Sequence, residues 1–389
     1  MGTLKVSKIL NANTTDGGIE IDSTGHVQVD GVQMPTAGQL SNRNLIINGD
    51  MRIAQRGTST TTSGTFAIDR FVCGFSNLSI TTSQETLSSG DPHDEGFRHF
   101  TRMTNSAASS ATSTFVQLDY KVEAQDMATC GWDYTNTNSY ISVQFWARSS
   151  LAGQYYIQLR AVDGGEDYWN HPYNLTANTW TKVEFKVPGN AIVTFNNDNG
   201  TGLFISIPPH YGTDFTGSTA QENAWFTRSG NDWYPDFDQD WGNTTGTFDI
   251  TGLQVEVGEK PTPFEHRSYG DELARCQRYY YRWTSGTAGR YLCMLQSFSS
   301  SQAFGIIKAL PVTMRAVPTS TVSGTFTPFD DNGTFAGHSA FTSTVMNQNT
   351  VNDLATNGWG GASGIDGGGR AVVLLVTEAD AFVDASAEL

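Results

Sequence analysis

Residues 140–162 read YISVQFWARSSLAGQYYIQLRAV, and this stretch decides the fold class. Every second side chain is apolar along two runs, 141–147 and 155–161, and turn-forming residues separate the runs. Alternation with a period of two is typical of β-strands that bury one face. The sequence therefore predicts a β-hairpin in which Phe145 lies opposite Ile157 and Trp146 lies opposite Tyr156.

The second face of this predicted hairpin mixes aromatic and polar side chains and is expected to face solvent. Its members are Gln144, Trp146, Arg148, Tyr156, Gln158 and Arg160. Flat rings can stack on the C–H faces of sugars, while amide and guanidinium groups can bond sugar hydroxyls. The face is therefore a candidate glycan-binding surface.

The same alternation recurs along the middle of the chain and predicts strands over 115–123, 180–187 and 203–207. A further strand is predicted around 248–257, where Phe248 and Ile250 share one parity and Leu253 and Val255 share the other. A β-bulge at Thr251-Gly252 would keep both pairs on the buried face. Many short strands separated by turn residues indicate an all-β protein with a sandwich or jelly-roll core.

Four segments are predicted along the chain. Residues 1–43 form a β leader that contains a hairpin over 18–29, and such a hairpin is only marginally stable alone. We therefore expect the leader to dock on sister chains, on a larger assembly or on the next domain. Residues 44–266 form the jelly roll, 267–276 a short helical linker that Ser268 caps, and 277–389 a sandwich-like C-terminal β domain. Its Gly- and Asn-rich loops over 325–370 are expected to form an exposed recognition tip.

Charge excludes several classes of partner. The 389-residue chain has a net charge of −16, and only 16% of its residues are charged. Nucleic-acid binding requires a basic footprint, which the sequence lacks, and anionic membrane surfaces are disfavoured for the same reason. The apolar run over 371–376 is too short to span a bilayer, and residues 1–5 lack the apolar stretch of a secretory signal. The acidic balance predicts neutral or cation-bridged receptors.

Motifs of catalysis are absent from the sequence, which predicts a protein without enzymatic activity or cofactor. The Asp236-x-Asp238-x-Asp240 spacing resembles the start of a calcium loop, so a structural calcium site is a candidate there. Trp241 and Thr247 replace the glycine and glutamate of an EF-hand, which excludes that motif. The four dispersed cysteines are predicted to be small buried hydrophobes, with one long-range disulfide as the alternative.

Two loops are unusually rich in aromatic residues, one at 167–173 and the other at 225–241. They provide further candidates for glycan contact, with packing at a subunit interface or at the sandwich rim as the alternative. Together with Trp146, Tyr156, Gln144 and Arg160, the candidate glycan-binding residues are Tyr168, Trp169, His171, Tyr173, Trp225, Trp233, Trp241 and Trp359.

A set of motifs in fixed order resembles the tail-fibre and related virion-fibre proteins of bacteriophages. These motifs are NLIINGDMRIAQRG at 44–57, IDRF at 68–71, GLQVEVG at 252–258, TPFE at 262–265, CQRYY at 276–280, LPVTMRAVPT at 310–319 and AEL at 387–389. The motifs are interpreted as structural. Asn48, Asp50, Gln55 and Arg56 are expected to fix the start of the central domain, and Glu265, Arg267 and Arg278 its end.

The resemblance implies a carbohydrate-binding-module-like jelly roll in a homotrimer on the phage particle. The leader would attach to other virion proteins, and the fibre would bind host surface glycans for adsorption. Two alternatives stay open: a head fibre or capsid decoration protein that binds no receptor, and a glycan depolymerase. The location on the tail or the head, the host and the receptor sugar are not fixed by the sequence.

Overall fold

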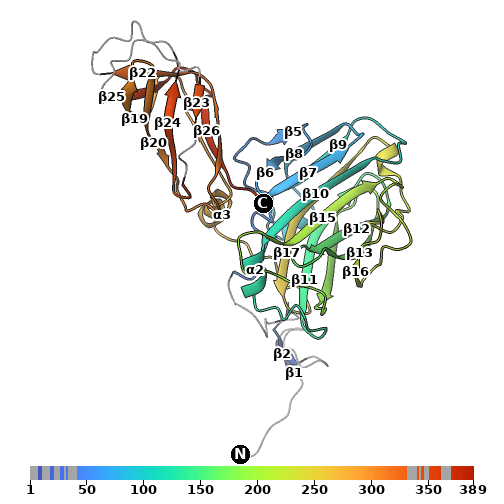
Figure 1. Cartoon of the computed structure of the whole chain (residues 1–389). Helices are drawn as coiled ribbons and strands as arrows, with labels where there is room; N and C mark the ends of the chain where they lie inside the picture. The colour runs from blue at the N-terminus through green and yellow to red at the C-terminus, as the bar shows by residue number, and fades with distance from the viewer. Residues whose placement is uncertain are drawn as a thin grey trace, which may run out of the picture. The chain divides into compact units, whose positions relative to one another are not determined.

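The computed structural model describes residues 8–10, 18–21, 27–29, 32–33, 42–330, 340, 343–345, 350–360 and 369–389 (Figure 1). They divide into two compact units, residues 1–267 and 268–389. Among the described residues no helix is long and apolar enough to cross a membrane. The all-β class predicted from the sequence is confirmed, since nearly every element is a strand.

The leader forms a four-stranded antiparallel sheet from β1 (Lys8–Leu10), β2 (Gly18–Ile21), β3 (Val27–Val29) and β4 (Val32–Gln33). The predicted hairpin over 18–29 is its central pair. The register aligns one apolar residue from each strand in a single cross-strand row, which consists of Ile9, Ile19, Val29 and Val32. The opposite face carries the Lys8–Glu20 ion pair at 2.7 Å. The leader sheet is therefore amphipathic.

Two large antiparallel sheets form the sandwich of the first unit. The seven-stranded sheet has the order β16 (Trp225–Thr227), β13 (Asp167–Leu175), β12 (Gly153–Ala161), β15 (Thr201–Tyr211), β10 (Phe115–Glu123), β7 (Phe71–Ser76) and β6 (Thr65–Ile68). The six-stranded sheet has the order β14 (Thr181–Pro188), β11 (Tyr140–Ser149), β17 (Gly246–Val257), β9 (His99–Asn105), β8 (Ile80–Thr86) and β5 (Ser59–Thr60). Short helices α1 (Asp91–Asp94), α2 (Ala124–Thr129) and η1 (Trp241–Asn243) lie in the connections.

The alternating apolar residues of both sheets meet in one core. The Phe145 ring of β11 packs edge-on against Tyr173 of β13 with 5.3 Å between centroids, and Tyr155 of β12 contacts Phe248 of β17 at 5.2 Å. Predicted strands 115–123, 180–187 and 203–207 correspond to β10, β14 and β15. Their apolar residues lie in this core, so the predicted burial is confirmed.

The predicted hairpin of residues 140–162 is wrong, although both of its strands exist. Strand β11 pairs with β14 and β17, whereas β12 pairs with β13 and β15 in the other sheet. The connection after Ser149 crosses from one sheet to the other, and the Ser149 hydroxyl bonds that of Tyr155 at 2.8 Å. Alternation shows which face of each strand is buried, but it does not identify the strand that pairs with it.

The bulge predicted in β17 is confirmed. The pairing of β11 with β17 shifts register between Gln144 and Trp146, opposite the Thr251-Gly252 step. Gly252 has a φ of +69°, and a Cβ there would lie 2.7 Å from the Phe97 ring, so only glycine fits this position. Phe248, Ile250 and Leu253 are all fully buried as a result.

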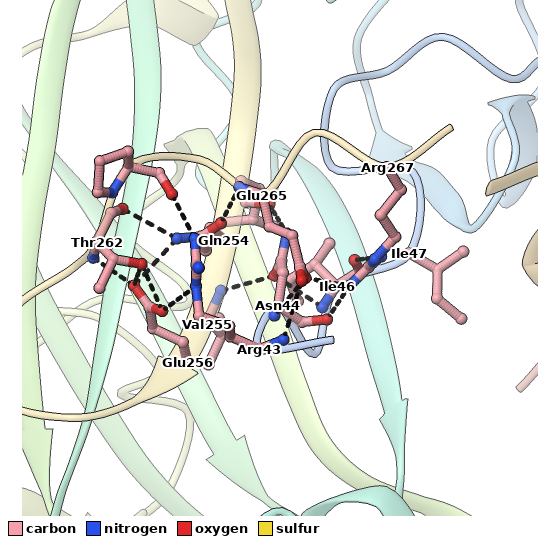
Figure 2. A network of polar contacts seen from close by, with 12 residues as sticks. Arg43, Asn44, Ile46, Ile47, Gln254, Val255, Glu256, Thr262, Glu265 and Arg267 are labelled. Atoms are coloured by element: carbon pink, nitrogen blue, oxygen red, sulfur yellow. Dashed lines mark hydrogen bonds and ion pairs between the residues drawn. The ribbon is translucent and has the colours of Figure 1, made fainter. Parts of the chain in front are cut away.

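A network of polar contacts closes the sandwich by joining its first and last segments (Figure 2). The Glu265 carboxylate accepts the backbone N–H of Asn44 at 3.0 Å, and the Arg267 guanidinium donates to the carbonyl of Ile46 at 3.0 Å. The Asn44 side chain bonds the backbone of β17, where it accepts from the Val255 N–H at 3.1 Å. Gly49 packs directly against β17, and only glycine fits there because a Cβ would lie 2.1 Å from the Leu253 carbonyl oxygen. We call this set the closing network.

The roles expected for the motif residues are met in the first unit. Asn48 accepts the N–H of Ile53 and donates to the carbonyls of Ile53 and Asp69, each at 2.9 Å. Gln55 and Arg56 contact the Asp69 carboxylate, and Asp50 pairs with Arg52 at 3.0 Å. Arg278 differs from the expectation, because it belongs to the second unit and forms the C-cap of helix α3.

The second unit is a smaller sandwich that begins with α3 (Tyr269–Gln277), which Ser268 caps as predicted. One sheet has the order β18 (Tyr280–Thr284), β26 (Phe382–Ser386) and β21 (Thr319–Ser323). The other has the order β22 (Phe326–Asp330), β25 (Ala371–Val376), β19 (Arg290–Ser299), β20 (Gln302–Ala309), β24 (Asp353–Gly360) and β23 (Ser343–Val345). The predicted apolar strands at 291–298, 304–307 and 371–376 are β19, β20 and β25.

The motifs of the second unit also converge. The N–H of Arg315 bonds the carbonyl of Arg278 at 2.9 Å, and its guanidinium donates to the Ala387 carbonyl at 2.9 Å. The Ala387 N–H in turn bonds the Tyr279 carbonyl at 2.8 Å. Three motifs far apart in the sequence therefore form one structural junction, as their interpretation predicted.

All four cysteines are free thiols, so the alternative of a long-range disulfide is wrong. Cys73 and Cys276 are buried, whereas Cys130 and Cys293 are half-buried. Burial raises the pKa of the Cys73 and Cys293 thiols to about 12. Thiols with such pKa values stay protonated at neutral pH and behave as small apolar side chains.

Candidate functional site

The outer faces of the two large sheets are covered, which corrects the expectation that they face solvent. Among the predicted glycan-binding residues on these faces, the exposed fractions are 2% for Gln144, 7% for Trp146, 1% for Tyr156 and 8% for Arg160. Their sequence alternates polar and apolar residues as a solvated strand would, but connecting segments pack over both sheets. These rings cannot stack on a sugar without movement of the covering segments.

Four further candidates point into the sandwich core rather than out of it. Trp169, Tyr173, Trp225 and Trp241 all belong to the main apolar cluster, and none is more than 8% exposed. Trp169 and Trp225 face each other on paired strands with 5.8 Å between ring centroids. The aromatic richness of the two loops therefore serves packing at these positions, which was the alternative interpretation.

His171 is half-buried and stacks on Phe185 with 3.9 Å between ring centroids. Its Nδ1 lies 2.6 Å from the Asn223 side-chain oxygen, and burial lowers the pKa of the imidazole. The ring is occupied on one face by Phe185. Trp359 lies in β24, and its side chain is outside the described residues. Half of the segment 325–370, which was predicted as tip loops, is also outside them, and the described half includes the strands β22, β23 and β24.

The outer face of the six-stranded sheet is packed and electrostatically balanced. The Trp146 indole N–H donates to the Glu95 carboxylate at 3.1 Å, and Gln144 donates to the Thr262 carbonyl at 2.8 Å. Arg102 and Arg148 both pair with Asp249, each with a shortest contact of 2.7 Å. Asp249 is only 1% exposed, so its buried charge is neutralised from both sides.

The outer face of the seven-stranded sheet carries a buried polar row. Direct cross-strand pairing aligns Asn170 of β13, Gln158 of β12, Ser206 of β15 and Asp119 of β10. All four are at most 5% exposed. The segment 212–245 covers them, since Gln158 donates to the Trp233 carbonyl at 2.7 Å and Tyr156 packs against Phe237 at 5.1 Å.

The adjacent row on the same face consists of cations and aromatic rings. It contains Tyr168, Arg160, Phe204 and Lys121, in cross-strand order. The Arg160 guanidinium carbon lies 3.7 Å from the centroid of Phe204 and 5.2 Å from that of Trp233. Arg228, from the covering segment, lies 4.3 Å from the Trp233 centroid. Phe204, Trp233, Arg228 and Lys121 are only half-buried, so this part of the face reaches solvent. We call these six residues the cationic–aromatic patch.

Several polar atoms beside the patch are buried without a hydrogen-bond partner. They include Asp119 Oδ1, Gln158 Oε1 and Arg160 Nε. Burial raises the pKa of Asp119 to about 7, while Arg160 and Lys121 lower it by their positive charge and Ser206 and Gln117 lower it by hydrogen bonding. Buried polar groups are normally satisfied, so unpaired donors and acceptors on adjacent strands make this face a candidate ligand site.

The candidate calcium ligands serve separate local roles. Asp236 accepts a bond from Thr216 at 2.6 Å, Asp238 accepts the N–H of Gln154 at 2.6 Å, and Asp240 caps η1. Among the described residues, no three His, Cys, Asp or Glu side chains are grouped to hold a metal ion. The Asp-x-Asp-x-Asp spacing therefore does not assemble the predicted site.

Sequence reasoning found Tyr168, Arg160 and Trp233 but missed Phe204, Arg228, Lys121 and Asp119. Phe204 lies between Leu203 and Ile205, two buried apolar residues of β15. Because Phe204 is also apolar, nothing in the sequence assigned it to the outer face. Position parity was the available signal, since Phe204 and Ser206 share the face opposite to the core. Arg228 could not be found in this way because the covering segment has no regular alternation.

No protein-family model matches the chain, and no curated protein matches its sequence. Among solved structures, the enzymatically active domain of tailspike protein 4 of bacteriophage CBA120 is similar, with 9% identity and a TM-score of 0.31 over 55% of this chain. The match spans only 21% of that tailspike chain.

Two further structures are similar over about their full length. A family 11 carbohydrate-binding module of Clostridium thermocellum, in complex with a β-1,3-1,4-mixed-linked tetrasaccharide, has 9% identity and a TM-score of 0.24 over 54% of this chain and 98% of its own. A cyclase of Fischerella sp. TAU has 7% identity and a TM-score of 0.31 over 58% of this chain and 100% of its own. These scores are too low to assign a function.

Proposed function

We propose that the chain is a non-enzymatic phage fibre protein that binds host surface glycans and assembles as a homotrimer on the virion. The single observation that carries glycan binding is the cationic–aromatic patch beside a buried polar row. Phe204 and Trp233 are half-buried rings, and the neighbouring strands carry donors and acceptors with no partner. Rings and hydrogen-bonding groups on one rigid sheet are what recognition of a sugar requires.

The ordered motifs support the fibre assignment in a different way. They resemble those of phage tail-fibre and virion-fibre proteins, and they form the closing network and the junction around Arg315. Motifs with a structural role are consistent with a family of virion proteins that share a scaffold and differ in their binding surfaces. The same motifs would serve a head fibre, so tail or head location stays outside the proposal.

The leader sheet supports assembly into a homotrimer. Ile9, Ile19 and Ile21 are 58%, 46% and 43% exposed on its described strands. Apolar side chains gathered on one exposed face of a sheet are typical of a surface that another chain covers. Light scattering of the purified chain is expected to give three times the 42.3 kDa mass of one chain. A stable monomer would refute the trimer.

Glycan binding is tested with purified protein and host cells, and with polysaccharide extracted from them. Trp233→Ala removes a ring of the patch and is expected to weaken binding about fivefold, since ring stacking is worth about 1 kcal/mol. The matched control is Trp180→Ala, which removes a half-buried indole that lies 4.5 Å under Arg148 on the other sheet.

The results separate the candidate functions. Loss of binding in Trp233→Ala but not in Trp180→Ala supports the patch as the glycan site. Failure of the wild-type trimer to bind cells and polysaccharide would refute the proposal and favour a head fibre or decoration protein. Release of reducing ends from bound polysaccharide would instead show a depolymerase.

A further inference from the structure

Two arginines of the cationic–aromatic patch form no ion pair with the described residues, although the positive charge of Arg160 lowers the pKa of the nearby Asp119 carboxyl. Arg160 is 8% exposed and forms neither a hydrogen bond nor an ion pair with the described residues, and Arg228 forms no ion pair with them. The chain has 39 acidic residues and only 23 basic ones. Unpaired arginines are unexpected against this excess of carboxylates, particularly when one of them is buried.

The two guanidinium groups contact the same two aromatic rings. Both lie over Trp233, at 5.2 Å for Arg160 and 4.3 Å for Arg228, and both lie 5.8 Å from the ring of Tyr168. The Arg228 Nε donates to the Tyr168 hydroxyl at 3.3 Å, and its Nη1 donates to the Gly230 carbonyl. Two like charges on the same rings repel each other, and an anion between them would relieve that repulsion.

The acidic groups near the patch do not neutralise it. Glu166 accepts the Tyr168 hydroxyl and forms no ion pair with either arginine. Asp119 lies in the buried row, where the Gln117 amide donates to it at 2.5 Å, and its other oxygen is unpaired. Lys121 adds a third cation, 5.8 Å from the Phe204 ring.

The opposite sheet shows what a neutralised pair looks like in the same molecule. Arg148 also stacks on rings, 4.5 Å from Trp180 and 5.6 Å from Phe100, but it shares the Asp249 carboxylate with Arg102. A buried carboxylate therefore accompanies the ring-stacked arginines on one face. On the other face the described residues supply no carboxylate that pairs with the two arginines.

We propose that Arg160 and Arg228 form a subsite for the carboxylate of an acidic sugar, with Phe204 and Trp233 contacting the sugar ring. Planar guanidinium groups bind carboxylates with two parallel hydrogen bonds, and rings beside them select a carboxylate attached to a flat apolar face. This inference rests on the proposed glycan-binding function and names its ligand class. It modifies the expectation of neutral receptors, because the patch is locally cationic on an acidic protein.

The test compares three probes by calorimetry with the purified full-length protein: oligogalacturonate, the same oligosaccharide after its carboxyl groups are reduced to alcohols, and inorganic phosphate. The oligogalacturonate is expected to bind at least tenfold more tightly than its reduced form, because each charge-assisted hydrogen bond contributes about 1.5–3 kcal/mol. Its affinity is also expected to fall with added salt.

Variants assign the effect to the two arginines. Arg228→Gln, at a half-buried position, is expected to weaken oligogalacturonate binding at least tenfold, and Arg228→Lys to weaken it less. Arg160→Met is expected to have the same effect as Arg228→Gln. Arg148→Gln is the matched control, since it removes a ring-stacked arginine from the other sheet, and it should leave the affinity unchanged. Unfolding midpoints establish that each variant is folded.

Three outcomes would overturn the inference. Equal affinity for the acidic and reduced oligosaccharides would leave glycan binding intact and remove the acidic subsite. Equal losses in Arg148→Gln and Arg228→Gln would show a general charge effect. Phosphate binding that is as tight as that of oligogalacturonate and persists in Trp233→Ala would show a simple anion site. Binding of neither oligosaccharide would also refute the acidic subsite, whereas the proposed function fails only if host cells and their polysaccharide stay unbound too.

Discussion

The two outer faces of the sandwich differ in how the positive charge of their ring-contacting arginines is neutralised. Each face carries arginines that contact aromatic rings. On the six-stranded sheet, Arg102 and Arg148 share Asp249, and its carboxylate raises the pKa of Arg102 still further. On the other face, Arg160 and Arg228 contact rings but form no ion pair with the described residues, and Arg160 acts on Asp119 only through its charge. The first arrangement neutralises the buried charge within the chain, whereas the second leaves two arginines without an ion pair among the described residues, as the proposed acidic-sugar subsite requires.

The largest expected effect is on the neutralised face. Asp249→Ala leaves Arg102 and Arg148 without their common partner and should lower the free energy of unfolding by about 4 kcal/mol. Chemical denaturation measures this change. A loss below about 1 kcal/mol would mean that the two arginines reach water freely, and the contrast between the two faces would disappear.

The next effect concerns pH and the buried row. Because burial raises the pKa of Asp119 to about 7, the folded state keeps its proton between pH 4 and 7 while the unfolded state releases it. The folded state then binds more protons, so the contribution of Asp119 to stability declines as pH rises through this window, by up to about 4 kcal/mol. Asp119→Asn should lack this decline in pH-dependent denaturation. Identical pH profiles of the two proteins would contradict the prediction.

The smallest expected effect compares two single arginine variants directly. Arg148→Met loses an ion pair to a buried carboxylate and should cost about 1–2 kcal/mol. Arg160→Met loses ring contacts but also removes an unpaired buried charge, so its unfolding free energy should stay within about 1 kcal/mol of the wild type. If Arg160→Met were instead the more destabilising variant in thermal or chemical unfolding, the predicted contrast between the two faces would be wrong.

The sequence predicted the features that depend only on the order of residues within one strand. Strand alternation identified the core residues of β10, β14 and β15, and the change of parity located the bulge at Gly252. It failed for the pairing of β11 and β12, because alternation is the same whether neighbouring strands share a sheet or face each other across the core. Ring-rich polar strands were assigned to solvent because nothing local reports a covering segment.

The candidate site was predicted only in part for the same reason. Arg160, Tyr168 and Trp233 were found as aromatic and polar residues, but their meeting depends on contacts between distant segments. Gln158 and the carbonyl of Trp233, for example, are 75 residues apart. Whether an arginine has an acidic partner is also a property of the folded chain. The contrast between Arg148 and Arg160, two arginines on neighbouring strands of the sequence, was therefore invisible before folding.

The closing network has a mechanical consequence. Glu265 and Arg267 hold Asn44 and Ile46 directly, so tension applied between the leader and the second unit would pass across these bonds. The roughly two hundred residues between them form a side loop that carries no load until the network breaks. A force applied between the two ends of the chain would then spare the sandwich, and the geometry of the cationic–aromatic patch would stay unchanged.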